Sequence, residues 1–527
     1  MNSLNRIIYC IIDDVRADQF FRLIEKGLLP NFKKFYEQGI YSKNCVTDFP
    51  AVTYPTHVSM ITGTHTGDFR NELCHGVPLY NWMERAVAPP FFRSYGTYGS
   101  DEWIQIYKMN EDIGTKCQTI LEMIDDGNKA SILQFVNRGT DYFYPETKMK
   151  LAFYYLFLKN SRNVEKYLDR LNSFVVQKIL ETFEHPHRFF NSNEVPTASL
   201  LWFVSSDILL HLFGSNSDQY LRNMIHIDTV FGFLLRKLDH LGYLNDTAIA
   251  VASDHGNYEA STFGDLSPFI RKYNLNNYHP RKNVRGTINL TDIGGIGFIN
   301  VKPRNCYSKS CWYPPQLKDL ENYGPKRINL LSELFKIQGC KLMYYKDDSN
   351  GTDKGIIQLK NRMNSSGKIT SGYLEYRGKG ENIKIKYVSE NQENDTFGYN
   401  NDERAMKMMD NAFHTPEEWL KNTYHVDYPC YPELVSRHFK NPRGGDIVIS
   451  TQGTVVYNIT HGKHKKVSRY VHDLGIRSCS IVPLLIGGSK EIPHKEIEYC
   501  KTVDIVPTLL KMIHVKPHKS VMGQSLF

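Results

Sequence analysis

The chain has 527 residues, of which 41% are hydrophobic and 23% charged, so it can bury a large core, and this composition excludes a disordered protein. The formal net charge of +8 is small for this length, which favours small anionic ligands over a stable nucleic-acid complex. The ten cysteines form neither a zinc-knuckle nor a CxxC pattern, so we expect free thiols in a reducing compartment.

The first half of the chain alternates strand-like and helix-like segments. RIIYCIID is an apolar run that carboxylates interrupt at once, so we interpret it as a core strand and not a signal peptide, and we expect a cytoplasmic protein. Amphipathic helices are predicted near FFRLIEKG and LPNFKKFYEQG, and buried strands at SLLWFVSSD and TAIAVASDHG. This alternation predicts an α/β fold in which a mostly parallel sheet is sandwiched between helices.

One segment, VPTASLLWFVSSDILLHLFG, approaches the length of a transmembrane helix. Asp207 and His211 lie near its centre, where they would be costly in lipid. We therefore predict a buried strand followed by a helix, and no transmembrane segment.

The composition of the chain changes after TAIAVASDHG. From about Phe263 to Pro442 the sequence is rich in Asn, Gly, Lys and Tyr and contains hairpin-like pieces such as SSGKITSGYLEYRGKGENIKIKYV. The α/β pattern resumes at GGDIVIS, at CSIVPLLIGG and in the final helix TVDIVPTLLKMI. We therefore predict an α/β core made of residues 1–262 and 443–527, with residues 263–442 inserted as an α+β cap.

Two aspartates stand where predicted strands end. Asp13 follows RIIYCII, and Asp254 follows TAIAVAS with His255 directly after it. In an open α/β sheet the carboxyl ends of the strands line the crevice where ligands bind. A single aspartate at such a place is usually only a helix cap or a turn former, so each residue alone is a weak signal.

The turn VTYPTH places Thr53 two residues ahead of Pro55, whose fixed φ suits the first turn of a helix. Thr53 would then lie at a helix N-terminus, where unpaired amides and the positive end of the dipole stabilise a phosphoryl group. A bound metal would activate its hydroxyl as a nucleophile. A plain capping turn has the same sequence, so this motif gains meaning only beside the others.

Further carboxylates and imidazoles complete a possible metal site. Asp207 and His211 are four residues apart, so on a helix they share one face and can bind one cation. His461 in VVYNITHGKHKK could supply a third imidazole, with His464 as its rival in the same turn. Three carboxylates and three imidazoles can hold two divalent cations.

The ordered set D…TxP…DxxxH…SDHG…HG resembles the alkaline phosphatase superfamily, and specifically its type I phosphodiesterase and nucleotide pyrophosphatase branch. The likeness spans nearly the whole chain. The tail TVDIVPTLLKMIHVKPHKSVMGQSLF is similar to the DIxPTLL…MxGxSL ending of that superfamily, and YPELV with NPRGGDIV resembles the branch ahead of its last metal histidine.

The resemblance implies a two-metal phosphoesterase that hydrolyses phosphodiester or pyrophosphate bonds of a small phosphorylated substrate such as a nucleotide. One metal would be held by Asp13, Thr53, Asp254 and His255, and the other by Asp207, His211 and His461, which the resemblance favours over His464. Thr53 would attack phosphorus in line and form a phospho-threonine that is then hydrolysed. Zinc suits this mixed carboxylate and imidazole set, with manganese as the alternative.

The sequence departs from the branch at three places. Asp14 stands where the family has a glycine, and we interpret it as a turn residue, with an extra carboxylate at the site, as in sulfatases, as the alternative. SDILLHLFG keeps the metal-binding pair but lacks the proline and the first glycine of PDxxGHxxG. Asn81 follows His75 and Gly76 one residue later than the asparagine that binds a nonbridging phosphate oxygen in the branch, and we assign it that role.

Other functions stay open. A phosphomonoesterase or a phosphonate hydrolase of the same superfamily would use a similar threonine and metal set. A sulfatase would need a C/S-x-P-S-R motif, which Thr53 in TYPTH does not provide, and a cofactor-independent phosphoglycerate mutase would carry a serine nucleophile. The alternative from another class is a catalytically inactive binding protein on the same fold, which measured turnover would exclude.

Overall fold

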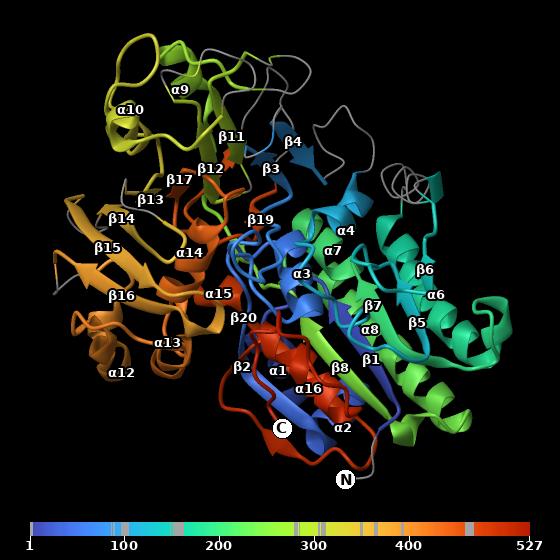
Figure 1. The fold of residues 1–527 in the computed structure, drawn as a ribbon. Helices are drawn as coiled ribbons and strands as arrows, with labels where there is room; N and C mark the ends of the chain where they lie inside the picture. Colours follow the sequence, from blue (N-terminus) through green and yellow to red (C-terminus); the bar gives the residue numbers. More distant parts are fainter. Residues whose placement is uncertain are drawn as a thin grey trace.

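The structure is a computed structural model of the chain, in which two β-sheets lie side by side (Figure 1). It describes residues 4–527 except residues 86, 88–89, 96–104, 148, 151–162, 279–282, 284, 293, 304–305, 307–311, 348–350, 363–366, 392–394 and 459–467.

A nine-stranded sheet forms the core, in the order β21–β2–β20–β8–β1–β7–β5–β6 with β22 also paired to β2. Its strands are β1 (Arg6–Ile12), β2 (Ile40–Val46), β5 (Asn128–Ile132), β6 (Tyr142–Tyr144), β7 (Pro196–Phe203), β8 (Thr247–Ser253), β20 (Ile481–Gly488), β21 (Lys495–Glu496) and β22 (Cys500–Lys501). β1 runs parallel to both β7 and β8, whereas β20 runs antiparallel to β8 and β2. The prediction of a mostly parallel α/β sheet is confirmed.

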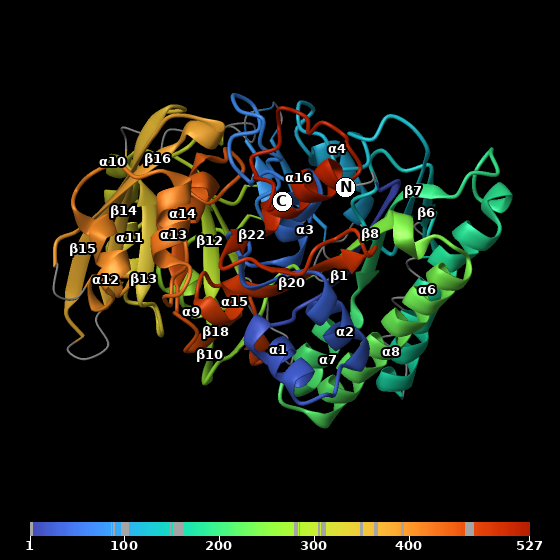
Figure 2. The ribbon, with the colours of Figure 1, turned by 90° about the horizontal axis from the view of Figure 1, so that it is seen from below.

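Helices cover both faces of this sheet, as Figure 2 shows. Along β1, the even-numbered residues from Ile8 to Ile12 pack in one apolar cluster and the odd-numbered residues from Ile7 to Ile11 in another, because successive side chains of a strand point to opposite faces. The first cluster includes residues of α1 (Ala17–Glu25), α2 (Pro30–Gln38), α6 (Val164–Glu184) and α8 (Asp218–His240). The second includes residues of α3 (Thr53–Thr62) and α16 (Ile505–Met512).

The second sheet is antiparallel, in the order β11–β12–β17–β13–β14–β15–β16. Its strands are β11 (Ile288–Asp292), β12 (Ile296–Val301), β13 (Leu342–Lys346), β14 (Lys354–Arg362), β15 (Ile369–Arg377), β16 (Lys384–Ser389) and β17 (Ile447–Ser450). The helices of this part of the chain are α9 (Ser267–Lys272), α10 (Leu317–Glu321), α11 (Leu330–Leu334), α12 (Glu403–Met406), α13 (Pro416–Thr423) and α14 (Tyr431–Lys440).

One strand expected in the core belongs to this second sheet. The segment GGDIVIS forms β17, which is hydrogen-bonded between β12 and β13 and does not join the core sheet. In addition, β10 (Thr262–Asp265) pairs with β18 (Val455–Asn458). The expected boundary at 262 therefore falls within β10, and the one at 443 separates β17 from its partners β12 and β13, because a short buried strand has the same apolar pattern in either sheet. The division into core and cap stays a prediction.

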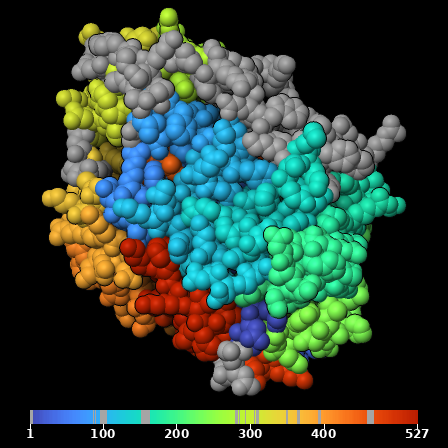
Figure 3. All heavy atoms as spheres, turned by 45° about the vertical axis from the view of Figure 1, so that its right-hand side comes forward, coloured from blue at the N-terminus to red at the C-terminus, as the bar shows by residue number. Residues whose placement is uncertain are grey.

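The segment after α3 lies between the second sheet and the part of the core around α6. In Figure 3 its blue and cyan surface separates the yellow and orange surface of the second sheet from the green surface around α6. This segment contains α4 (Met109–Asp112) and the hairpin of β3 (Asn81–Glu84) and β4 (Phe91–Ser94). The remaining short elements are α7 (Ser205–Phe213), α15 (Arg477–Ser480), β9 (Tyr258–Glu259) and β19 (Tyr470–Val471).

Two further expectations concern the membrane and the cysteines. Among the residues that the structure describes, no helix combines the length and apolar character needed to cross a membrane. Eight cysteines are buried free thiols, but Cys306 is disulfide-bonded. The expectation of free thiols is wrong for Cys306, because a spacing that fits no zinc or redox motif does not argue against a disulfide.

Candidate metal centre

Three neighbouring parallel strands bring the carboxylates together. β8, β1 and β7 lie side by side in register, and Asp13 and Asp254 directly follow β1 and β8. Asp207 lies in the first turn of α7, which begins two residues after β7 ends. The carboxyl ends of parallel strands meet at one edge of the sheet, so three residues far apart in sequence face one place, as predicted.

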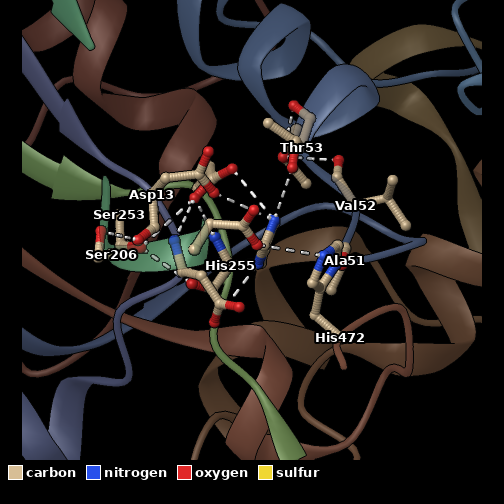
Figure 4. Close-up of polar contacts among 12 residues, drawn as sticks. Asp13, Ala51, Val52, Thr53, Ser206, Ser253, His255 and His472 are labelled. Atoms are coloured by element: carbon tan, nitrogen blue, oxygen red, sulfur yellow. Dashed lines mark hydrogen bonds and ion pairs between the residues drawn. The ribbon is translucent and has the colours of Figure 1, made fainter. Parts of the chain in front are cut away.

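The first group of side chains surrounds His255 (Figure 4). Its Nε2 lies 3.1 Å from Thr53 Oγ1, 3.2 Å from Asp254 Oδ2 and 3.7 Å from Asp13 Oδ1. The other carboxylate oxygens are already engaged. Trp202 Nε1 donates to Asp13 Oδ2 (3.0 Å), and the backbone N–H groups of Asp14 and His255 donate to Asp254 Oδ1 (3.1 and 3.0 Å). The Thr53 hydroxyl and one oxygen each of Asp13 and Asp254 are therefore left facing His255 Nε2.

The second group consists of Asp207, His211 and His472. Asp207 Oδ1 lies 3.1 Å from His211 Nε2 across one turn of α7, and 3.7 Å from His472 Nε2. Both histidines use Nδ1 elsewhere, since His211 donates to the carbonyl of Tyr470 (2.7 Å) and His472 to that of Ala51 (3.0 Å). These backbone contacts orient both rings with Nε2 toward Asp207, as is typical of metal-binding histidines.

The donor atoms fit two divalent cations. Asp13 Oδ1, Asp254 Oδ2 and Asp207 Oδ1 are buried and have no hydrogen-bond partner among the described residues, although each faces an imidazole. A buried carboxylate oxygen without a partner is costly, and a metal ligand is the common exception. Imidazole nitrogen, carboxylate oxygen and a hydroxyl are donors that zinc accepts, and manganese tolerates them.

The pKa values of the site residues reflect the crowding of carboxylates and imidazoles in a buried place. Burial lowers the pKa of His255 and of His211, but Asp254 and Asp207 respectively outweigh it and raise each pKa to about 9. Burial raises the pKa of Asp13, and Asp254 adds to the shift. Burial and the neighbouring His255 lower the pKa of His472 to about 3. Protonated imidazoles of His255 and His211 thus balance the clustered carboxylates, a charge that cations would replace.

Thr53 is the first residue of α3, as the position of Pro55 predicted. Its hydroxyl points from the helix N-terminus toward His255 (Figure 4). The N-terminal amides and the helix dipole favour an anion at this end. A phosphoryl group placed against Thr53 would therefore meet positive potential on the helix side.

The histidine that the structure places in the second group differs from the one that the sequence predicted. His461, and its rival His464, lie outside the described residues, so the role of His461 stays a prediction. His472 was not predicted, yet its ring stacks on that of His255, with centroids 3.8 Å apart. It is followed by Asp473 and not by glycine, so the HG pattern passes over it. Its place depends on the pairing of β19 with β9, which no pattern in its own neighbourhood indicates.

Asp14 and Asn81 are the remaining candidates. Asp14 has a left-handed φ of 55°, which suits a turn, but its side chain is buried and accepts from Asn257 Nδ2 at 2.8 Å. Burial raises the pKa of Asp14 to about 6. Asn81 begins β3, and its Oδ1 is buried without a hydrogen-bond partner among the described residues. Its phosphate-binding role stays a prediction.

Comparisons with known proteins identify the family of this chain. The sequence model of the family "Type I phosphodiesterase / nucleotide pyrophosphatase" matches residues 8–310. The human bis(5'-adenosyl)-triphosphatase ENPP4 is 21% identical over 257 residues, covering 49% of this chain and 48% of that protein. Rat ectonucleotide pyrophosphatase/phosphodiesterase family member 1 is 23% identical over 314 residues, covering 58% of this chain and 30% of that protein. This chain spans about half the length of the first curated relatives that it matches.

Solved structures share the fold at low identity. Human ectonucleotide pyrophosphatase/phosphodiesterase 5 has a TM-score of 0.55 and 13% identity, covering 97% of this chain and 95% of that one. The murine protein of the same name has a TM-score of 0.53 and 12% identity, covering 97% and 96%. Because the family match extends over more than half of the sequence, the chain belongs to the type I phosphodiesterase/nucleotide pyrophosphatase family.

Proposed function

We propose that this chain is a two-metal phosphoesterase that hydrolyses phosphodiester or pyrophosphate bonds through a phospho-threonine at Thr53. The observation that carries the proposal is the place of Thr53 Oγ1, at a helix N-terminus and 3.1 Å from the nitrogen of His255 that also faces Asp13 and Asp254. A hydroxyl beside such a ligand set is positioned for nucleophilic attack.

Each residue would have a defined task. Asp13, Asp254 and His255 would hold one cation beside Thr53, and Asp207, His211 and His472 would hold the other. Two bound cations of this kind stabilise negative charge on the attacking and leaving oxygens. Thr53 Oγ1 forms the bond to phosphorus as the bond to the leaving oxygen breaks. Water then cleaves the phospho-threonine and restores the hydroxyl.

Names of relatives support a nucleotide as the substrate. One curated relative is named a bis(5'-adenosyl)-triphosphatase, and a murine relative was solved as an inactive threonine-to-alanine variant in complex with AMP. We propose zinc as the metal, with manganese as the alternative, because both suit the donor set. A cytoplasmic location stays a prediction, which cell fractionation would test.

The test is a substrate panel assayed with the full-length chain and added Zn²⁺ or Mn²⁺. Dinucleoside polyphosphates and simple phosphodiesters should be cleaved with higher kcat/KM than monoesters and phosphonates. A higher kcat/KM for a monoester would favour the phosphatase alternative, and C–P cleavage the phosphonate hydrolase. No turnover of any member by a protein that binds two metals would favour an inactive binding protein.

A further inference from the structure

His57 is a fully buried histidine of α3 and is not one of the proposed metal ligands. It lies one turn after Thr53, behind the first metal group. Its Nε2 is 3.2 Å from Asp254 Oδ2, the same carboxylate oxygen that faces His255 Nε2. A buried polar ring beside a candidate metal ligand needs a physical role, because burial without one is costly.

The other nitrogen of His57 indicates which form of the ring is present. The side-chain amide of Gln134 contacts Nδ1, with Nε2 at 2.9 Å and Oε1 at 3.2 Å. The backbone N–H of Val136 donates to Oε1 of Gln134 (3.4 Å), so this oxygen is the acceptor end of the amide. The closer Nε2 of Gln134 then donates to Nδ1 of His57. A neutral imidazole that accepts at Nδ1 carries its proton on Nε2, toward Asp254.

Aromatic side chains hold the ring in this orientation. Phe135 lies against one side of His57, with ring centroids 4.9 Å apart, and Trp202 meets it edge to face at 5.3 Å. Trp202 also donates to Asp13 Oδ2 (3.0 Å). Asp13 and Asp254, which are expected to bind the first metal, thus each lie beside a ring nitrogen, and the two rings, Trp202 and His57, pack against each other.

We propose that His57 is a positioning residue that donates Nε2–H to Asp254 and fixes this carboxylate for the first metal. The inference rests on the proposed two-metal function. Asp254 Oδ2 and His57 Nε2 lie 3.2 Å apart but are not aligned as a hydrogen bond, and His255 faces the same oxygen. When His255 uses Nε2 for a cation, His57 Nε2 is the remaining described N–H beside Asp254 Oδ2, because the backbone N–H groups of Asp14 and His255 donate to Oδ1.

A different role can be separated from this one. Asp13, His57 and Asp254 also form a cluster whose atoms could surround an ion. In that case His57 Nε2 would need a free electron pair, and its proton would lie on Nδ1. The contact from Gln134 Nε2 to Nδ1 argues for the donor form instead.

Paired substitutions of His57 test the proposal. His57→Phe keeps a ring that packs on Phe135 and Trp202 but removes the donor, whereas His57→Gln keeps an amide donor near the position of Nε2 and removes the ring. Zn²⁺ affinity is measured on the metal-free full-length chain by competition with a chelator. The first binding step is identified by its loss in Asp254→Asn, and the second by its loss in Asp207→Asn.

Loss of a group that orients a metal ligand costs about 10- to 100-fold in affinity. We therefore expect His57→Phe to weaken the first step by this factor and to leave the second within about threefold, and His57→Gln to recover at least half of the loss on a logarithmic scale. His438→Phe, at another buried histidine, is the control for the ring replacement and should change neither step.

Three outcomes decide the matter. An unchanged first step in His57→Phe, or equal losses in His57→Phe and His57→Gln, overturns the donor role. Fewer than two Zn²⁺ ions bound by the wild-type chain overturns the proposed function and this inference with it. If His57→Phe does not fold, Gln134→Met replaces it, because this change leaves His57 in place; a weakened first step supports the proposal, and wild-type affinity overturns it.

Discussion

Thr53 begins a helix where three strand ends meet, so its hydroxyl has a fixed direction toward the metal ligands. We expect Thr53→Ala to lower kcat by about 10³-fold or more, because no other described hydroxyl takes this place. Two-step metal binding should persist, since Thr53 is one donor among several. Thr53→Ser should keep part of the rate, since the oxygen remains. Mass spectrometry of acid-quenched enzyme should locate the phosphate on Thr53. Phosphate on another residue, or near-normal activity of Thr53→Ala, would contradict the mechanism.

His472 is the residue on which structure and sequence motif differ. Its Nε2 faces Asp207, whereas the motif favours His461. We expect His472→Ala to weaken the second metal-binding step by at least about 10-fold and to leave the first step near its wild-type affinity. His461→Ala is the matched comparison. Isothermal titration with Zn²⁺ measures both. A larger effect of His461→Ala on the second step would contradict the assignment of His472.

The residue scale also shows what the sequence can predict. Asp13 and Asp254 were identified because each follows a strand pattern, Asp207 because it stands four residues before His211, and Thr53 because of the proline two residues later. His472 has no such local pattern. Its place depends on the backbone of β19, which pairs with β9 more than two hundred residues away in sequence. Side chains that a long-range contact positions cannot be read from their own neighbourhood.

At the scale of elements, α14 is tied to the core by buried charge. Glu433 of α14 is fully buried and forms ion pairs with Arg437 (2.7 Å) and with Lys501 of β22 in the core sheet. Burial raises the pKa of Glu433, but Lys501 and Arg437 outweigh it, so its pKa lies well below the usual value of 4.5. Breaking a buried ion pair leaves an uncompensated charge and costs about 3–5 kcal/mol.

This arrangement predicts a pH-dependent loss of stability. We expect Glu433→Gln to lower the free energy of unfolding by about 3–5 kcal/mol at pH 7. Because the folded pKa is depressed, the contribution is complete above 4.5, the usual pKa of this group, and is lost as the pH falls through the folded pKa. The difference between wild type and variant should therefore shrink below this pH in urea titrations.

An exposed ion pair provides the control for that measurement. Glu165 and Arg222 lie 3.0 Å apart with side chains 35% and 61% exposed, so Glu165→Gln should cost less than about 1 kcal/mol. An equal cost of the two substitutions would mean that Glu433 contributes no more than a surface charge.

Sequence patterns predicted where several elements lie, but not which sheet a strand joins or in which direction it runs. The strands β1, β7 and β8 and the helices α1, α2 and α16 were predicted where they occur. β17 was assigned to the wrong sheet, because IVIS is a short and mostly apolar run, which carries no information about its partners. The antiparallel direction of β20 within the core sheet was likewise not visible in CSIVPLLIGG.

At the scale of the whole molecule, all clustered candidate ligands among the described residues come from outside residues 263–442. The inserted segment instead builds most of the second sheet, which β17 completes, and β10 pairs separately with β18. That this part of the molecule shapes access to the site stays a prediction.

Because the candidate ligands come from the core, metal removal should lower both the activity and the thermal stability of the chain. A ligand that binds only the folded chain stabilises it by RT ln(1 + [L]/Kd), which is about 2.7 kcal/mol at a hundredfold excess over Kd. We expect chelation to abolish turnover and to lower Tm, and Zn²⁺ or Mn²⁺ to restore both. Asp254→Asn should retain part of the rise in Tm through the second ligand group, and Asp207→Asn through the first, whereas the double variant should show none. The measurement is thermal unfolding at several metal concentrations. An equal rise in Tm for the double variant and the wild type would mean that the cations bind elsewhere, because neither carboxylate would then be a ligand.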